Sequence, residues 1–177
     1  MDITTALADA KRPEKTVSIC FRGDLRAEFE AVEAQLQQME RTDLVAPSLA
    51  SGGPRRQLAE RLEELRQEMI DGSVEFRLRG VGRRAWTQLM ADHPPRPDAD
   101  EDRGLGLNAD TFFHALIRTS TVEPALSDVQ WDTLLDDTLT SSQFQALADG
   151  AWVVNRGSVD IPFSPAASRI RSSSPPE

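Results

Sequence analysis

The sequence predicts a mainly α-helical protein with a small β component, an α+β fold of 177 residues. Two long segments carry apolar residues at steps of four and three, which is typical of helices that pack along a seam. Two short segments flank them and alternate apolar with polar residues, as half-buried strands do. We therefore expect a β-α-α-β unit over residues 1–80, a bundle of short helices over 81–157 and a flexible tail over 158–177.

The two predicted strands are residues 16–21 and 74–79, where apolar side chains occupy every second position. The segments between them predict two helices, and a helical hairpin would bring the two strands together. Paired strands then form a two-stranded ribbon, which is marginal alone and needs a third strand or a covering helix.

The two long helices are predicted to pack as an antiparallel hairpin. Asp24 is a candidate N-cap for the first helix, and the second begins after Pro54 and ends at Asp71 and Gly72. The connecting residues 42–54 are rich in small residues and helix breakers, so they can reverse the chain. The seam consists of Leu25, Phe29, Val32, Leu36 and Met39 on the first helix and Leu58, Leu62, Leu65 and Met69 on the second.

The second half of the chain predicts a compact bundle of short helices. These cover residues 81–92 and 110–118, a segment around Trp131, and a segment that Ser141 or Ser142 caps and that ends near residue 157. Residues 127–130 fit a capping box ahead of Trp131. The remaining tail is rich in serine and proline and is a candidate docking segment.

Composition favours a protein of a reducing compartment, the cytosol. Cys20 is the only cysteine, and no apolar run approaches the length that spans a bilayer. The formal charge is -9, and residues 93–177 carry 13 acidic against 6 basic side chains. Negative charge repels phosphate backbones and accommodates a basic protein partner more easily than nucleic acid, although an acidic surface can also serve solubility alone.

No motif indicates catalysis or a cofactor. Asp98, Asp100 and Asp102 have the initial spacing of a calcium loop, but Arg103 and Ala109 replace the required glycine and glutamate, so we expect a solvated acidic loop. Two glycines at 104 and 106 follow an acidic run and no buried strand, so we interpret them as turn glycines and not as a dinucleotide site. His93 and His114 are too far apart for a local metal motif. We expect neither an enzyme nor a bound metal or cofactor.

Large aromatic residues are the candidate partner-binding side chains. Trp86, Trp131 and Trp152 each lie on a predicted helix beside other apolar residues, and Phe163 lies in the tail. They can pack in the core or can anchor a partner helix, since large aromatics supply much contact area at small entropic cost.

Several short motifs occur in a distinctive order along the second half. They are Arg-Ala-Trp-Thr-Gln-Leu at 84–89, His-Pro-Pro-Arg at 93–96, the acidic run, Leu-Asn-Ala-Asp-Thr-Phe at 107–112, Ala-Trp-Val-Val-Asn-Arg at 151–156 and Pro-Phe-Ser at 162–164. This order resembles a family of tail assembly chaperones from long-tailed, siphovirus-type phages of high-GC actinobacteria. None of the motifs has a known catalytic meaning.

The resemblance implies a protein that binds the long tape measure protein in the host cytoplasm, keeps it soluble and helps the tail tube protein polymerise around it. Such chaperones are usually absent from the finished virion, and self-association is possible. Two alternatives remain open at this stage: a minor structural component of a tail or of another phage-derived particle, and, more remotely, a small enzyme or nucleotide binder.

Overall fold

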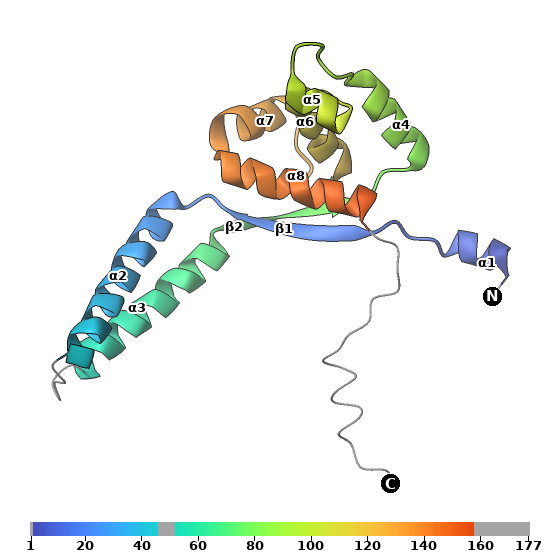
Figure 1. Ribbon diagram of the computed structural model, residues 1–177. Helices are drawn as coiled ribbons and strands as arrows, with labels where there is room; N and C mark the ends of the chain where they lie inside the picture. Colours follow the sequence, from blue (N-terminus) through green and yellow to red (C-terminus); the bar gives the residue numbers. More distant parts are fainter. Residues whose placement is uncertain (1, 46–51, 158–177) are drawn as a thin grey trace, which may run out of the picture.

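The computed structural model describes residues 2–45 and 52–157, and its fold class is the predicted one, helices with a small antiparallel sheet. Figure 1 shows a helical body on one side of the sheet and a long helical hairpin that leaves the sheet at one end. The elements are α1 (Ile3–Ala8), β1 (Glu14–Cys20), α2 (Gly23–Val45), α3 (Gly52–Asp71), β2 (Ser73–Arg79), α4 (Arg83–Asp92), α5 (Asp100–Leu105), α6 (Ala109–Ser120), β3 (Thr121–Glu123), α7 (Asp128–Asp132), the π-helix η2 (Thr133–Thr138) and α8 (Ser141–Arg156).

The two predicted strands pair antiparallel, with Val17 opposite Phe76. A short third strand, β3, completes a sheet of order β1-β2-β3, and Glu123 lies opposite Arg77. The ribbon thus receives both supports that a two-stranded ribbon lacks, a third strand and a covering helix, α8. Strand β3 was not predicted from the sequence, because three residues are too few to show an alternating pattern.

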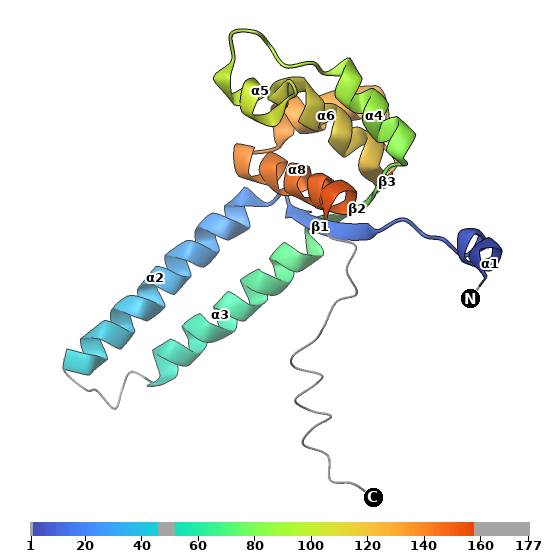
Figure 2. The ribbon, with the colours of Figure 1, turned by 45° about the vertical axis from the view of Figure 1, so that its right-hand side comes forward.

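The sheet separates an apolar face from a polar one. Ile19, Phe76 and Leu78 are buried on the face that carries the helical body, whereas Ser18 and Glu75 point to the opposite face and are exposed. Figures 1 and 2 show the helices of the body on a single side of the sheet. This arrangement follows from the two-residue period of a strand.

One hydrophobic core joins the sheet to the helices of the second half, so it crosses residue 80, where the sequence analysis divides the chain. Its buried members are Ile19, Phe76, Leu78, Leu107, Phe112, Leu116, Ile117, Trp131, Leu135, Leu147, Ala148, Ala151 and Val154. Helix α8 lies close to the sheet at Gly150, where an added Cβ would come within 2.6 Å of Val17 and 2.8 Å of Leu78. A residue with a side chain would therefore push the helix away from the sheet.

The predicted hairpin is confirmed: α2 and α3 run antiparallel side by side and project from the sheet (Figure 2). Leu25 and Leu65, near its base, are buried, and the other described seam residues are only half-buried. Arg61 of α3 bonds Glu28 of α2 at 2.8 Å across the pair. Residues 46–51 of the predicted turn lie outside the described residues, as do residues 158–177 with Phe163.

Several element ends differ from the predicted ones. Strand β1 begins two residues earlier, at Glu14, and α3 begins at Gly52, which places Pro54 in its first turn, where a missing amide hydrogen costs nothing. Asp24 lies inside the first turn of α2 instead of at its cap, and its carboxylate accepts hydrogen bonds from Arg22.

The helix caps of the second half are partly as predicted. Ser127 and Gln130 form the expected capping box. The expected cap of α8 at Ser141 or Ser142 is wrong, because Thr140 caps this helix in a second capping box with Gln143. Threonine serves as well as serine here, since either hydroxyl accepts from the amide three residues on.

Candidate partner-binding surfaces

Two of the three candidate tryptophans meet in one aromatic cluster. The rings of Trp86 and Trp152 lie edge to face with centroids 5.7 Å apart, and Phe112 is 5.7 Å from Trp86. Phe113 lies 5.4 Å from Phe112, and the guanidinium of Arg156 stands over the Trp152 ring. This cluster holds α4, α6 and α8 together, and aromatic pairs of this geometry add stability beyond the area they bury.

Trp131 lies apart from that cluster, on α7, and only 7% of it is exposed. Trp86 and Trp152 are half-buried. All three therefore pack within the body, and a partner role for any of them stays a prediction.

The acidic run differs from the predicted solvated loop. Residues 100–105 form the short helix α5, and the side chain of Asp102 is completely buried. Its carboxylate accepts hydrogen bonds from the backbone amide of Arg96 at 2.9 Å, from the Arg96 guanidinium at 2.7 and 3.0 Å, and from the amide of Ala109 at 3.2 Å. The hydrogen bonds from the Arg96 guanidinium and then from its amide hold the pKa of Asp102 well below its usual range.

These bonds give Asp102 a structural role. Arg96 also pairs with Asp110 in the first turn of α6. One guanidinium therefore links Asp102 of α5 to the start of α6. His93 contributes a contact of 2.8 Å between its Nδ1 and the Thr111 hydroxyl. Because Arg96 occupies the carboxylate, Asp102 cannot complete the calcium spacing, and over the described residues no three His, Cys, Asp or Glu side chains form a group able to hold a metal ion.

The two glycines of the rejected dinucleotide pattern have separate structural roles. Gly106 ends α5 in the left-handed conformation, with φ of 72°, and Asn108 caps α6 by accepting from the amides of Asp110 and Thr111. The prediction of a turn glycine before this cap is confirmed for Gly106. Gly104 lies inside α5 instead.

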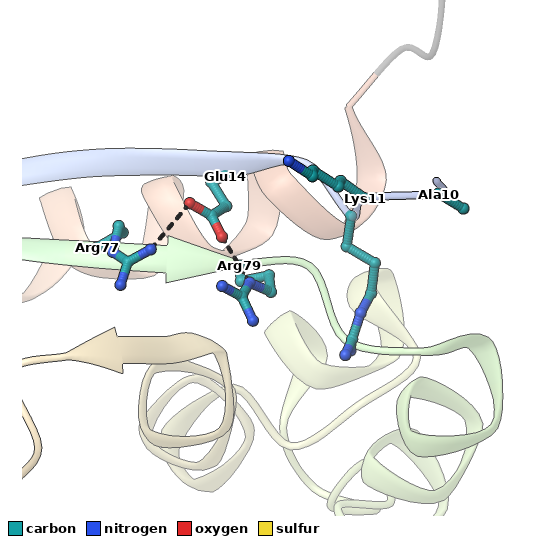
Figure 3. Close-up of a pocket in the computed structure, with 6 residues that line it drawn as sticks. Ala10, Lys11, Glu14, Arg77 and Arg79 are labelled. Atoms are coloured by element: carbon teal, nitrogen blue, oxygen red, sulfur yellow. Dashed lines mark hydrogen bonds and ion pairs between the residues drawn. The ribbon is translucent and has the colours of Figure 1, made fainter. Parts of the chain in front are cut away.

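A basic groove of about 650 Å³ runs along the end of the sheet (Figure 3). Glu14 of β1 accepts hydrogen bonds from Arg77 at 3.3 Å and from Arg79 at 2.6 Å, and Arg77 also bonds Glu123 of β3 at 2.7 Å. Carboxylates thus already bridge both arginines of β2, and these ion pairs tie the three strands together. Lys11 and Arg12 complete the basic lining, and Arg12 donates to the Gly80 carbonyl.

Two apolar hollows lie where the hairpin leaves the sheet. The first, of about 320 Å³, is lined by Phe21, Val74, Phe76, Pro124, Leu126, Gln130, Thr133, Leu134 and Thr138. The second, of about 330 Å³, is lined by Cys20, Phe29, Arg66, Met69, Ile70 and Ser73. They lie on opposite faces of the β1–β2 ribbon, because side chains alternate along paired strands: Val74 lines the first hollow, and its neighbour Ser73, paired with Cys20, lines the second.

Neither hollow was predicted from the sequence. Val74 and Met69 were assigned to a strand and to the hairpin seam, which is correct for their secondary structure. The residues that complete the first hollow come from a segment some 50 residues further along, after β3. The one available signal was Ile70, an apolar residue outside the predicted seam just before the Gly72 turn.

No protein-family model, curated protein or solved structure matches this chain. Across residues 2–45 and 52–157, no helix combines the length and apolar character needed to cross a bilayer.

Proposed function

We propose that this protein is a non-catalytic binding protein of phage tail assembly, which holds the long helical tape measure protein in the host cytoplasm until tail tube protein covers it. The observation that carries the proposal is the helical hairpin. Its helices of 23 and 20 residues extend about 30 Å, and apart from Leu25 and Leu65 the described seam side chains remain half-buried. A two-helix seam of this kind offers apolar contact to a third helix.

The charge of the hairpin supports a role in keeping a client soluble. The two helices carry eleven acidic and six basic residues, and several of the described charges pair on the outer surface, as Arg56 does with Glu60 and Arg66 with Glu63. A charged exterior around a half-buried apolar seam lets the hairpin bind an apolar stripe without aggregating itself.

The partial burial of the seam residues also favours release of the client. Each half-buried seam residue gains only part of the free energy of full burial when a client helix covers it. We therefore expect a dissociation constant in the micromolar range, which corresponds to a binding free energy on the order of -8 kcal/mol. Much tighter binding would compete with tube assembly. Under this proposal the protein leaves before the particle is complete and is absent from the mature virion.

Co-expression with the tape measure protein tests the proposal. The soluble yield of the tape measure protein should rise with the wild-type chain and fall back with Leu36→Glu, which puts a charge into the seam. Gln35→Glu adds the same charge at an exposed neighbouring position and should behave as the wild type. Equal soluble yield with and without the protein, and no complex in a low-salt pull-down, would refute the chaperone role.

Mass spectrometry of purified particles separates this role from the structural alternative. A chaperone should be absent from them or present far below one copy per tail ring. Stoichiometric recovery with the tail proteins would instead make the chain a structural component.

A further inference from the structure

Strand β1 lies at an open edge of the sheet. Its one neighbour among the described strands is β2, so every second residue of β1 turns its backbone N–H and C=O away from the sheet. The amide of Gly80 donates to the Pro13 carbonyl at 3.0 Å, which makes these two residues a hydrogen-bonded pair of the antiparallel ladder. The hydrogen-bonded pairs then continue at Lys15, Val17 and Ile19.

The open edge is formed by the residues between these pairs, Glu14, Thr16, Ser18 and Cys20, whose backbone groups point away from β2. A bond from α8 agrees with this assignment, because the side-chain amide of Gln143 donates to the Cys20 carbonyl at 2.8 Å. Within the described residues, the edge-facing groups of Glu14, Thr16 and Ser18 have no such partner, and the three residues are exposed. A row of unpaired backbone groups is a template for another extended strand.

A groove of about 610 Å³ lies beside the Cys20 end of this edge. Its lining includes Ser18 and Cys20 of β1 and Ser142 and Ala146 of α8. Val153, seven residues after Ala146 and therefore on the same face of α8, is 48% exposed. The helix beside the open edge thus presents small side chains and an uncovered apolar one.

A second copy of β1 matches this edge in one register. With Thr16 opposite Thr16 of the second copy, Glu14 lies opposite Ser18, and each residue pair exchanges two hydrogen bonds. This register uses the edge-facing groups of all three residues. It leaves out the Cys20 carbonyl, which is already bonded to Gln143.

The side chains that this register brings together are compatible. On the outer face of the sheet, two threonines lie opposite each other, which is a favourable cross-strand pair, and Glu14 lies opposite a serine. On the face of the helical body, Lys15 lies opposite Val17. No two like charges are therefore directly opposite, which would destabilise the pairing.

The charges around the edge select neither sign in an occupant. Glu14 is bridged to Arg77 and Arg79. Lys15 of β1 and Asp149, which lies on α8 between Ala146 and Val153, have opposite signs. The two arginines that line the groove are also paired, Arg22 with Asp24 and Arg26 with Glu30. The occupant must therefore match mainly the backbone groups, as an added strand does.

We propose that two copies of this chain pair through β1, antiparallel and with Thr16 at the twofold axis, and so join their two three-stranded sheets into one. The paired strands run in opposite directions, and the hairpin follows the Cys20 end of each (Figure 2). The two hairpins therefore leave the joined sheet at opposite ends. This dimer does not depend on the proposed function, although it would offer a client two hairpins instead of one.

Sedimentation of the full-length protein over a series of concentrations measures the association. The wild type should pass from monomer to dimer in the micromolar range. Thr16→Pro removes an edge-facing amide and no bond to β2, and an edge strand tolerates proline at such a position. Because each copy loses a central hydrogen bond, the dimer should weaken at least about tenfold. Thr16→Val is the matched control, because it keeps the amide and the shape of the side chain, and it should dimerise as the wild type.

Amide hydrogen exchange identifies the edge itself. In the monomer, the amides of Thr16 and Ser18 should exchange quickly, whereas those of Lys15 and Val17, which bond β2, should exchange slowly. Raising the protein concentration should slow exchange at Thr16 and Ser18 and leave Lys15 and Val17 as they were. This measurement uses the wild type, so it tests the inference even if circular dichroism shows that Thr16→Pro is unfolded.

The inference is overturned if the protein stays monomeric up to about 1 mM, a concentration at which even weak pairing is populated. It is also overturned by a dimer that folded Thr16→Pro leaves intact, or in which Thr16 and Ser18 exchange as fast as in the monomer, because another surface then forms the dimer. Slow exchange of both amides in a monomer would mean that the edge is covered within one chain, and would overturn it too. Solubilisation of the tape measure protein tests the proposed function separately.

Discussion

The carboxylate of Asp102 is completely buried and accepts four hydrogen bonds. Three of them come from Arg96, one from its backbone amide and two from its guanidinium. Arg96 in turn reaches Asp110 at the start of α6. A buried charge is tolerated only when it is paired and hydrogen-bonded, and this one is. The Arg96–Asp102 pair holds the segment between α4 and α6 against the core, although this segment has few apolar side chains.

Replacing Asp102 by Asn should destabilise the protein strongly. The amide nitrogen of asparagine would face the donors of Arg96, and the Arg96 guanidinium would lose its buried counter-charge. We expect the midpoint of thermal unfolding to fall by about 10 °C. Asp100→Asn is the control, because Asp100 is exposed and its described ion pair is with Arg103, one turn on. Equal melting temperatures for the two variants would contradict the structural role of Asp102.

The same carboxylate should make stability depend on pH in the acidic range. The pKa of Asp102 in the folded protein lies below its value in the unfolded chain, which is about 3.9, so the unfolded state takes up the proton first. Its contribution is complete above about pH 5 and is lost as the pH falls below about 4. Thermal melts from pH 6 to pH 2 should show a steeper fall for the wild type than for Asp102→Asn, and parallel curves would contradict this assignment.

Gly150→Ala should loosen the contact between α8 and the sheet. The new methyl group would lie within 3 Å of Val17 and Leu78, so helix or strand must shift, at a cost of about 1–3 kcal/mol. Gly104→Ala is the matched control, because Gly104 lies in α5 with nothing near its added Cβ, and it should be neutral or slightly stabilising. Urea unfolding measures both, and an unchanged midpoint for Gly150→Ala would mean that α8 lies further from the sheet.

Two leucines of the hairpin should respond differently to the same change. Leu65 is fully buried at the base of the hairpin, so Leu65→Asp should abolish much of the helical signal and lower the melting temperature steeply. Leu62 is half-buried, and an aspartate there can reach water, so Leu62→Asp should cost less. Circular dichroism at a series of temperatures measures both. A larger effect at position 62 would contradict the packing of the seam.

Phe112→Ala should disrupt the aromatic cluster. Phe112 is fully buried between the rings of Trp86, Trp152 and Phe113, and truncation of a buried phenylalanine costs about 3–5 kcal/mol. The near-ultraviolet circular dichroism of the two tryptophans should weaken with it. If stability fell and that signal stayed unchanged, the two tryptophans would not be packed on Phe112.

The parts of the fold that were predictable are those with a repeating pattern. The steps of four and three from Leu25 to Met39 and the alternation around Phe76 depend only on local geometry, so they identify the hairpin and the strands without tertiary information. The capping box at Ser127 is local in the same way.

The features that were not predictable depend on distant or irregular segments. The burial of Asp102 depends on a turn that brings Arg96 back over α5, and a run of acidic residues by itself indicates a solvated loop. The hollow beside Val74 exists because β3 is only three residues long and the chain continues through Pro124 and Leu126. Neither arrangement leaves a periodic signal.

Hydrogen exchange of the protein with and without the tape measure protein tests the central claim most directly. In the free protein, amides in the middle of α2 and α3 should exchange quickly, because few buried contacts hold the hairpin closed. Binding of the client should slow exchange along both helices and should leave α5 and α6 unchanged. Protection confined to the body, with the hairpin exchanging as before, would contradict the claim that the hairpin holds the client.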